Sequence, residues 1–454
     1  MHKKATTGFK VFFVAGRRLT ILVLVGVAAA AWYDSWTIVG LGECGWKMGL
    51  SIIFVYVIPT AILRLPLALW IGPMARDKVP DWVVTLPDLV RNFYNKPSGL
   101  LAAIVPMASI LYCCALLFAV GDVLNLVSGM PLWLAMAISG GIIIVYTALA
   151  GMWGLAVTDL IQFMVMTVSA GALVIGIMAH FGGIEVMYAA IEAKDPLLLT
   201  AMGHQTWLTA IPWLMSAAAL YVNAQSYQRF GAAKTSGDIK VAYSLMLTIG
   251  VLFSAAMVIA GMAASVMYPE AESISRGFWA TVFSVLPPGA RGLFVAALVA
   301  AVMSTVSADI LLTGGILMKD FYKDCFKPNL SDHEVVKGSQ VLIVIQGIFI
   351  IVGTYLWKDG IGEAWQIIGG FQLSCFFVPM MGGFFYKKKT AVGGLVSILF
   401  GIALYAVWTF ALNKPFGIPS PVITWAASAV VYFIVCEATY KGNGNGAKAV
   451  AQGG

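Results

Sequence analysis

The stretch LVAAVMSTVSADILLTGG, from Leu298 to Gly315, decides how this chain is interpreted. It has the apolar character of a lipid-buried helix, but it is interrupted by Ser304, Thr305, Ser307, Asp309 and Thr313. Polar side chains are costly inside a bilayer, so those that occur there usually face the interior of a helix bundle and mark the path of an ion or a solute. The stretch therefore predicts a membrane-spanning helix with a functional face.

The composition of the whole chain supports this environment. Apolar residues make up 60% of the 454 residues, charged residues only 11%, and the mean hydropathy is +0.89. These values lie far from those of soluble globular proteins, and about 20 mainly apolar residues cross a bilayer. We predict an all-α polytopic membrane protein with about twelve transmembrane helices, at residues 19–44, 47–74, 99–128, 131–150, 156–181, 207–229, 241–268, 291–317, 338–357, 363–386, 390–412 and 420–439.

The basic residues indicate the orientation of these spans. With the N-terminus inside, most of the 28 Lys and Arg residues fall on the cytoplasmic side, where such residues accumulate in short loops. We therefore expect a multi-pass protein of the plasma (inner) membrane with both termini in the cytoplasm, and a first span that is retained rather than cleaved. The net charge of +7 then reflects topology and contact with the anionic lipid bilayer, not nucleic acid. No feature of the sequence identifies a protein partner.

Polar residues inside the predicted spans form five clusters. Besides the opening stretch they are Tyr33, Asp34, Ser35 and Thr37 in span one, Thr158, Asp159 and Gln162 in span five, Asn223, Gln225 and Ser226 in span six, and Gln366 before Gly369 and Gly370 in span ten. Any one of these residues could simply form hydrogen bonds between helices. Five clusters together favour a transport path.

Spans one and six are predicted to be broken helices. In span one Gly40 and Gly42 follow the polar cluster, and in span six Asn223 interrupts an apolar run. Non-helical backbone at membrane depth survives only where protein or a water-filled cavity covers it, and paired broken helices in two halves point to the binding site of a transporter. Spans one to five and six to ten would be those halves, arranged as an inverted repeat.

One face of the opening stretch has the chemistry of a cation site. Ala301, Ser304, Thr305 and Ala308 lie at positions i, i+3, i+4 and i+7, which share a helix face. Two hydroxyls and a carbonyl there, set against freed carbonyls of broken span one, would supply about five oxygen ligands, which hard cations prefer. Because the cage is neutral, the predicted ligand is a sodium ion.

The sequence resembles the sodium/solute symporters that include the sodium/proline and sodium/galactose transporters. The resemblance covers nearly the whole chain and rests on five motifs in order: FFVAGRR (12–18), TLPD (85–88), YTALAGMWGLAVTDLIQ (146–162), YQRFGAAK (227–234) and FVAALVAAVMSTVSADILLTGGILMKDFYK (294–323). It implies a LeuT-type five-plus-five inverted-repeat core over 19–386, preceded by a cytoplasmic segment (1–18) and followed by two additional helices (387–440) and a flexible cytoplasmic tail (441–454). Family members usually have one more helix before FFVAGR, and this chain begins just ahead of that motif.

The resemblance also implies an ion site. The family's sodium ligands would fall on the carbonyls of Ala30, Tyr33 and Ala301 and the hydroxyls of Ser304 and Thr305. A second site, present in some members, would use Asp159, Ser304, Ser307 and a hydroxyl where this chain has Ala308. We therefore expect one sodium ion, with Asp159 and Ser307 at the ion exit or as a partial second site.

The family's solute-binding positions fall on Thr37, Tyr56, Asn223 and Gln366. The amides at 223 and 366 match sugar transporters, whereas Tyr56 replaces an acidic residue and Gln225 an aromatic gate, which argues against a galactose-like solute. Asp34 could hold a substrate amine or cap the broken helix.

The function expected is sodium-coupled symport of a small polar solute (sugar, amino acid or carboxylate) by alternating access, which requires no covalent chemistry and therefore no enzyme. Two alternatives stay open: a proton-coupled carrier of the same fold, in which Asp34 or Asp309 would titrate, and a membrane sensor that binds sodium and solute without transport.

Overall fold

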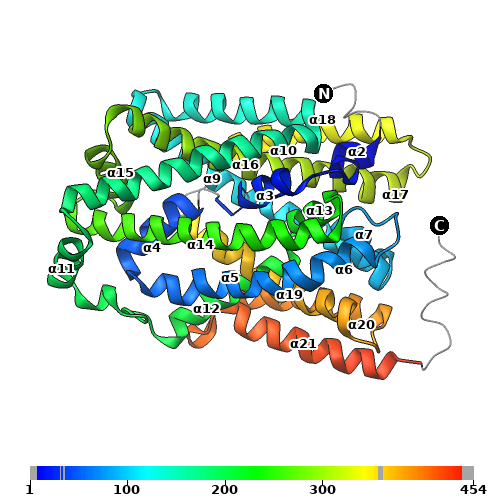
Figure 1. Cartoon of the computed structure of the whole chain (residues 1–454). Helices are drawn as coiled ribbons and strands as arrows, with labels where there is room; N and C mark the ends of the chain where they lie inside the picture. The colour runs from blue at the N-terminus through cyan, green and yellow to red at the C-terminus, as the bar shows by residue number, and fades with distance from the viewer. Residues whose placement is uncertain (1–7, 31, 34–35, 356–360, 442–454) are drawn as a thin grey trace.

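The computed structural model describes residues 8–30, 32–33, 36–355 and 361–441, and these residues form helices (Figure 1). The α-helices are α2 Phe9–Val14, α3 Ile21–Ala30, α4 Leu41–Met48, α5 Ile58–Pro66, α6 Gly72–Asp77, α7 Leu86–Phe93, α8 Lys96–Ala102, α9 Ile104–Ser128, α10 Leu132–Phe181, α11 Ile184–Lys194, α12 Trp207–Ala218, α13 Ala224–Ala232, α14 Ser236–Met267, α15 Ile274–Val285, α16 Pro288–Ile316, α17 Asp324–Phe326, α18 Asp332–Thr354, α19 Ile361–Phe385, α20 Ala391–Ala406 and α21 Ser420–Thr439. Short 3₁₀ or π turns extend or join them: η1 Ala15–Arg17, η2 Trp36–Gly40, η3 Ile53–Val57, η4 Leu67–Ile71, η5 Pro196–Leu199, η6 Ala219–Val222, η7 Leu317–Lys323, η8 Val407–Ala411 and η9 Pro415–Gly417.

Nine helices of the described part of the chain are long and apolar enough to cross a membrane. This number is three lower than that of the twelve predicted spans, for the following reasons. Spans four and five, 131–150 and 156–181, are joined in one run of 50 residues, α10, which consists of two helices that meet in a kink at Gly151. Spans one and six, 19–44 and 207–229, are each divided into shorter helices and so do not count as continuous ones.

Gly151 divides α10 where the two predicted spans meet. Its backbone angles are φ 56° and ψ −158°, a conformation that residues with a Cβ atom rarely adopt. A helix about twice as long as a bilayer is thick cannot cross it straight. The kink at Gly151 therefore turns one hydrogen-bonded run into two crossings.

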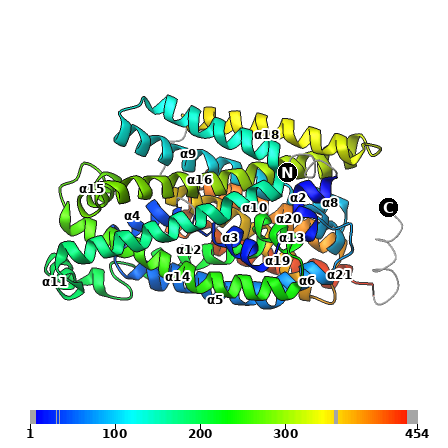
Figure 2. The ribbon, with the colours of Figure 1, turned by 45° about the horizontal axis from the view of Figure 1, so that its top comes forward.

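The long helices lie side by side in Figures 1 and 2. The short helices α11 and α15 lie at one end of this bundle, whereas α2, α6, α7, α17 and the last turn of α21 lie at the other. Helix α2 and the end of α21 therefore lie on the same side of the bundle, as an even number of crossings requires.

Helix α16 is the centre of the bundle. In the most apolar part of α16 and its extension, 83% of the residues are buried, against 28% in α10 and 22% in α21. It packs against α9, α10 and α18. The polar residues of the opening stretch are therefore enclosed by protein rather than by lipid.

Both predicted helix breaks are present. Helix α3 ends at Ala30, and the chain becomes helical again at Trp36. The sixth span is interrupted at Asn223, which has extended backbone angles and caps α13 by accepting a hydrogen bond from the Ser226 amide at 3.0 Å. In the first break Trp32 is 6% exposed and Tyr33 is fully buried, and Val222 directly before the second break is fully buried, so protein covers these segments, as a membrane interior demands.

The segment before the first span is wedged into the bundle. Phe12 and Phe13 of α2 are fully buried. A Cβ atom added to Gly151 would lie 2.7 Å from the Phe12 ring, and one added to Gly315 would lie 2.5 Å from the Phe13 ring. Gln228 of α13 donates a hydrogen bond to the Phe13 carbonyl at 2.8 Å. Helix α2 is thereby held against α10, α13 and α16 together.

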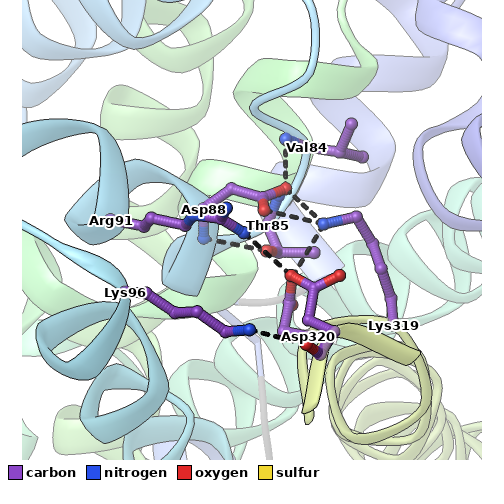
Figure 3. Close-up of polar contacts among 8 residues, drawn as sticks. Val84, Thr85, Asp88, Arg91, Lys96, Lys319 and Asp320 are labelled. Atoms are coloured by element: carbon purple, nitrogen blue, oxygen red, sulfur yellow. Dashed lines mark hydrogen bonds and ion pairs between the residues drawn. The ribbon is translucent and has the colours of Figure 1, made fainter. Parts of the chain in front are cut away.

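An ion cluster joins α7 to η7, the turn that extends α16 (Figure 3). Lys319 Nζ lies 2.7 Å from both carboxylate oxygens of Asp88 and 2.7 Å from Asp320 Oδ1. Asp88 also accepts hydrogen bonds from the amides of Val84 and Thr85, and its own amide donates to the Thr85 hydroxyl at 3.1 Å, which closes a capping box. The TLPD motif thus starts α7 and anchors it to the central helix.

Candidate ion and solute sites

The end of α3 meets the middle of α16 through side-chain hydroxyls. Ser304 Oγ lies 3.2 Å from the carbonyl oxygen of Ala30 and 2.9 Å from that of Ala301, and its single hydroxyl proton is shared between these two acceptors. Thr305 Oγ1 donates to the carbonyl oxygen of Ala301 at 3.2 Å. Four of the five residues predicted to bind sodium, Ala30, Ala301, Ser304 and Thr305, are therefore brought into direct contact.

The described residues directly after α3 donate their backbone hydrogen bonds to Ala29. The amides of Trp32 and Tyr33 both bond to its carbonyl oxygen, whereas the Ala30 carbonyl accepts from Ser304. The side chain of Tyr33, the fifth predicted residue, is used elsewhere: its hydroxyl donates to the Ile249 carbonyl at 3.0 Å and its ring stacks on Phe253 at 3.8 Å. Tyr33 thus fixes this turn against α14, and only its backbone oxygen could serve an ion.

The donor set suits a monovalent hard cation. Hydroxyl and carbonyl oxygens are the ligand types that such ions prefer, and the contacting atoms here carry no formal charge. A serine or threonine hydroxyl can turn from donating to accepting, because it has one proton and two lone pairs. The oxygens that Ser304 and Thr305 bring to Ala30 and Ala301 could therefore hold a sodium ion.

Beside this contact lies a cavity that is open on one side. It is lined by Ala28, Trp32, Trp36, Thr37, Tyr56, Thr60, Arg64, Ser109, Tyr112, Leu220, Asn223, Gln225, Ser226, Arg229, Tyr243, Thr305, Asp309, Trp365, Ile368 and Gln372. Both broken spans contribute to it, and Thr305 belongs to the cavity and to the hydroxyl contact alike. Ion and solute sites would therefore be adjacent.

Four of the predicted solute residues line this cavity: Thr37, Tyr56, Asn223 and Gln225. Trp36 holds Tyr56 in place by donating to its hydroxyl at 3.3 Å. Asp34, the remaining prediction in span one, lies outside the described residues.

Gln366 is not among the lining residues. Helix α19 instead contributes Trp365, Ile368 and Gln372, which lie at i, i+3 and i+7 on one face. Gln366 is one residue further along than Trp365 and so lies about 100° around the helix axis. Sequence reasoning missed Gln372, although the same spacing could have revealed it once one lining residue was known; its amide donates to Ser109 Oγ at 3.3 Å.

Charged side chains are part of the cavity wall. The Arg64 guanidinium lies over the Trp32 ring, 3.6 Å from its centroid. Arg229 and Asp309 are both linked to Gln225 of α13. The sequence marked Asp309 as unusual at its depth, but nothing in it indicated that Gln225 connects Asp309 to Arg229.

Asp159 and Ser307, the predicted ion exit or partial second site, lie on α10 and α16. Asp159 is fully buried, and neither of its carboxylate oxygens has a hydrogen-bond partner among the described residues. Ser307 donates to the Ser304 carbonyl at 3.2 Å. Arg229 is close enough to Asp159 to interact with it electrostatically. Ser307 is thus joined through Ser304 to the predicted cage, whereas Asp159 is not hydrogen-bonded to it.

Two broken spans around a central polar cavity, in a bundle of apolar helices, define a secondary transporter. The chain belongs to the Sodium:solute symporter family, whose model matches residues 12–401. It is an integral membrane protein that couples sodium to solute transport, and it is not an enzyme. A proton-coupled carrier and a sensor are not favoured by this membership.

Relatives match this chain over nearly its whole length. The osmoregulated proline transporter OpuE of Bacillus subtilis is 24% identical over 96% of this chain and 92% of its own. The sodium/pantothenate symporter of Escherichia coli is 23% identical over 90% of this chain and 86% of its own. Sodium-coupled monocarboxylate transporter 2 of Bos taurus is 24% identical over 92% of this chain and 71% of its own.

Solved structures show the same fold. A sodium-coupled sialic acid symporter matches with a TM-score of 0.82 at 18% identity, covering 96% of this chain and 93% of its own. A nucleobase-cation-symport-1 family transporter matches with a TM-score of 0.64 at 14% identity, covering 94% and 95%. These likenesses confirm the LeuT-type fold class that the sequence resemblance implied.

Proposed function

We propose that the chain carries one sodium ion and one small polar organic solute together across the plasma (inner) membrane. The ion would be held by the carbonyls of Ala30, Tyr33 and Ala301 with the hydroxyls of Ser304 and Thr305. The observation that supports this most is the bonding of Ser304 to both Ala30 and Ala301, because it brings a broken helix and the central helix to one point.

The solute would occupy the cavity next to the ion. Its wall offers indole rings, hydroxyls, amides and guanidinium groups, which suit a sugar, an amino acid or a carboxylate. Relatives named for proline, pantothenate, glucose and monocarboxylate support this range. Thr37, Tyr56, Asn223 and Gln225 are the proposed contacts; Gln366 and Asp34 remain predictions from the sequence.

Transport would proceed by alternating access in a core of ten helices, 19–386, with 387–440 as two additional helices. Both termini would be cytoplasmic, which agrees with the basic residues at that end of the bundle. Sodium and solute each raise the other's affinity by the same factor, by linkage. The membrane potential would drive the cycle with about 2.3 kcal/mol per charge per 100 mV.

Proteoliposomes test this proposal. Purified protein would be supplied with labelled proline, pantothenate, glucose, lactate and sialic acid under a sodium gradient, with choline replacing sodium as the control. We expect at least one solute to accumulate only with sodium. Accumulation driven by a pH gradient without sodium would contradict sodium coupling. Sodium-dependent solute binding without uptake or counterflow exchange would identify a sensor instead.

A further inference from the structure

A chain of hydrogen bonds joins the sixth span to the central helix. Arg229 Nη1 donates to Gln225 Oε1 at 2.9 Å, and Gln225 Nε2 donates to Asp309 Oδ1 at 2.6 Å. The three residues are between 3% and 6% exposed. The Gln225 amide is held in one orientation because its oxygen faces a cation and its nitrogen faces an anion.

The two ends of the Gln225–Asp309 hydrogen bond belong to different sites. Gln225 follows Asn223 by two residues, directly after the break in the sixth span, and both line the solute cavity. Asp309 follows Thr305 by four residues on α16, so the two share the helix face toward the cavity. A displacement of α16 at the ion cage would thus be transmitted to α13, where the solute is held.

The chemistry of this hydrogen bond makes it suited to transmission. A hydrogen bond to a carboxylate is roughly twice as strong as a neutral one, and a dry interior strengthens it further. The other Asp309 oxygen accepts from the Cys113 thiol, a weak donor, at 3.5 Å. Of these two hydrogen bonds, the one from Gln225 is the shorter and the stronger.

We propose that the Gln225–Asp309 hydrogen bond couples the sodium site to the solute cavity, with Asp309 acting as a positioning residue rather than as an ion ligand. The inference rests on the proposed symport function. Sodium binding between α3 and α16 fixes Asp309, Asp309 fixes Gln225, and Gln225 sets the start of α13. The solute then finds α13 already ordered, which raises its affinity without any contact to the ion.

Exchange of the donor and the acceptor tests this hydrogen bond specifically. Gln225→Glu keeps the size of the side chain and can still accept from Arg229, but it places two carboxylates face to face. Adding Asp309→Asn lets the new amide donate to the new carboxylate at position 225, which restores the hydrogen bond in the opposite direction and returns the pair to a single negative charge. Gln225→Met removes the donor without adding charge and serves as a second disruptive variant.

Sodium itself is the probe. Hydrogen–deuterium exchange of nanodisc-embedded protein would be compared in NaCl and KCl of equal ionic strength, alongside binding of radiolabelled sodium. In the wild type we expect sodium to slow exchange across α13. Gln225→Glu and Gln225→Met should bind sodium but lose this slowing, and the exchanged pair Gln225→Glu/Asp309→Asn should regain it. Thr313→Val is the control, because it deletes another buried hydroxyl of α16, bonded to Pro106 rather than to α13.

The possible results distinguish the proposed symport function from the proposed coupling role of the Gln225–Asp309 hydrogen bond. Failure of the folded wild type to bind sodium would contradict the proposed function. Sodium binding with unaltered slowing in both single variants would overturn the coupling role alone, as would a wild type in which sodium leaves α13 exchange unchanged. Loss of the slowing in Thr313→Val as well would show that any disturbance of α16 suffices and would also overturn it.

Discussion

The hydroxyl of Ser304 donates to the carbonyl oxygen of Ala30 at 3.2 Å, joining residues 274 positions apart in the sequence. This contact lies where a helix ends inside the bundle, so the carbonyl is not needed to continue that helix.

Replacing both Ser304 and Thr305 with Ala should raise the sodium concentration for half-maximal uptake at least about tenfold, since 1.4 kcal/mol is tenfold in affinity. Sodium-dependent uptake measures this. Thr313→Ala, on the same helix, should behave as wild type, and unchanged sodium dependence in the double variant would refute the ion-site assignment.

Uptake should depend on sodium with a Hill coefficient near one. The reason is Ala308, a buried methyl group where a second ion would require a hydroxyl. Initial rates across a range of sodium concentrations, with charge movement measured in parallel, give the stoichiometry. Two charges carried per neutral solute would show that a second ion binds despite Ala308, with Asp159 as the first candidate for its ligand.

Asn223 should contribute to solute affinity separately from its role as a helix cap. Asn223→Asp keeps the oxygen that accepts from Ser226 but removes the amide donors, so solute binding should weaken while thermal stability stays near that of wild type. A buried group left without its partner costs about 1 to 3 kcal/mol. Sodium affinity without solute should be unchanged. Loss of sodium binding in the folded variant would place Asn223 in the ion cage instead.

The two glutamines of α19 form a matched pair. Gln372 lines the cavity and Gln366 does not, so Gln372→Leu should weaken solute binding more than Gln366→Leu. Titration calorimetry with the best transported solute would measure both. The reverse order would support the solute position expected from the family resemblance, with α19 rotated about its axis in the solute-bound state.

Loss of the Lys319 ammonium group should lower the melting temperature much more than loss of the Lys388 ammonium group, which is also paired. Lys319→Met would leave Asp88 and Asp320 buried without their cation, and breaking such a pair typically costs about 3 to 5 kcal/mol. Lys388 pairs with Glu437 at the same distance of 2.7 Å, but both are about half exposed, so Lys388→Met should have little effect. Apparent melting temperatures in one detergent compare the two, and equal shifts would contradict the importance of burial.

The sequence predicts this fold well where the signal is local. Apolar runs indicated the long helices, and Asn223 in an apolar span indicated the break that starts α13. The shared face of Ser304 and Thr305 follows from spacing alone. What spacing cannot supply is the rotation of a helix about its own axis, which depends on packing against neighbours. That is why Gln366 and Gln372 could not be told apart.

The contacts between distant segments were also beyond the sequence. Asp309 stood out as an unusual residue at its depth, but its partner Gln225 lies 84 positions away on a separate helix. By contrast, the kink at Gly151 falls between the two spans that the sequence predicts, 131–150 and 156–181. The contact between Gln225 and Asp309 arises from tertiary packing that no local pattern encodes.

The wedge formed by α2 has a thermodynamic consequence. Phe12 rests against Gly151 and Phe13 against Gly315, so each ring fills a notch that only glycine leaves open. Any rearrangement that lifts this segment into water must rehydrate two aromatic rings, at roughly 1.5 to 3 kcal/mol each. Such a rearrangement would therefore be a minority population unless another process supplied free energy of about this size.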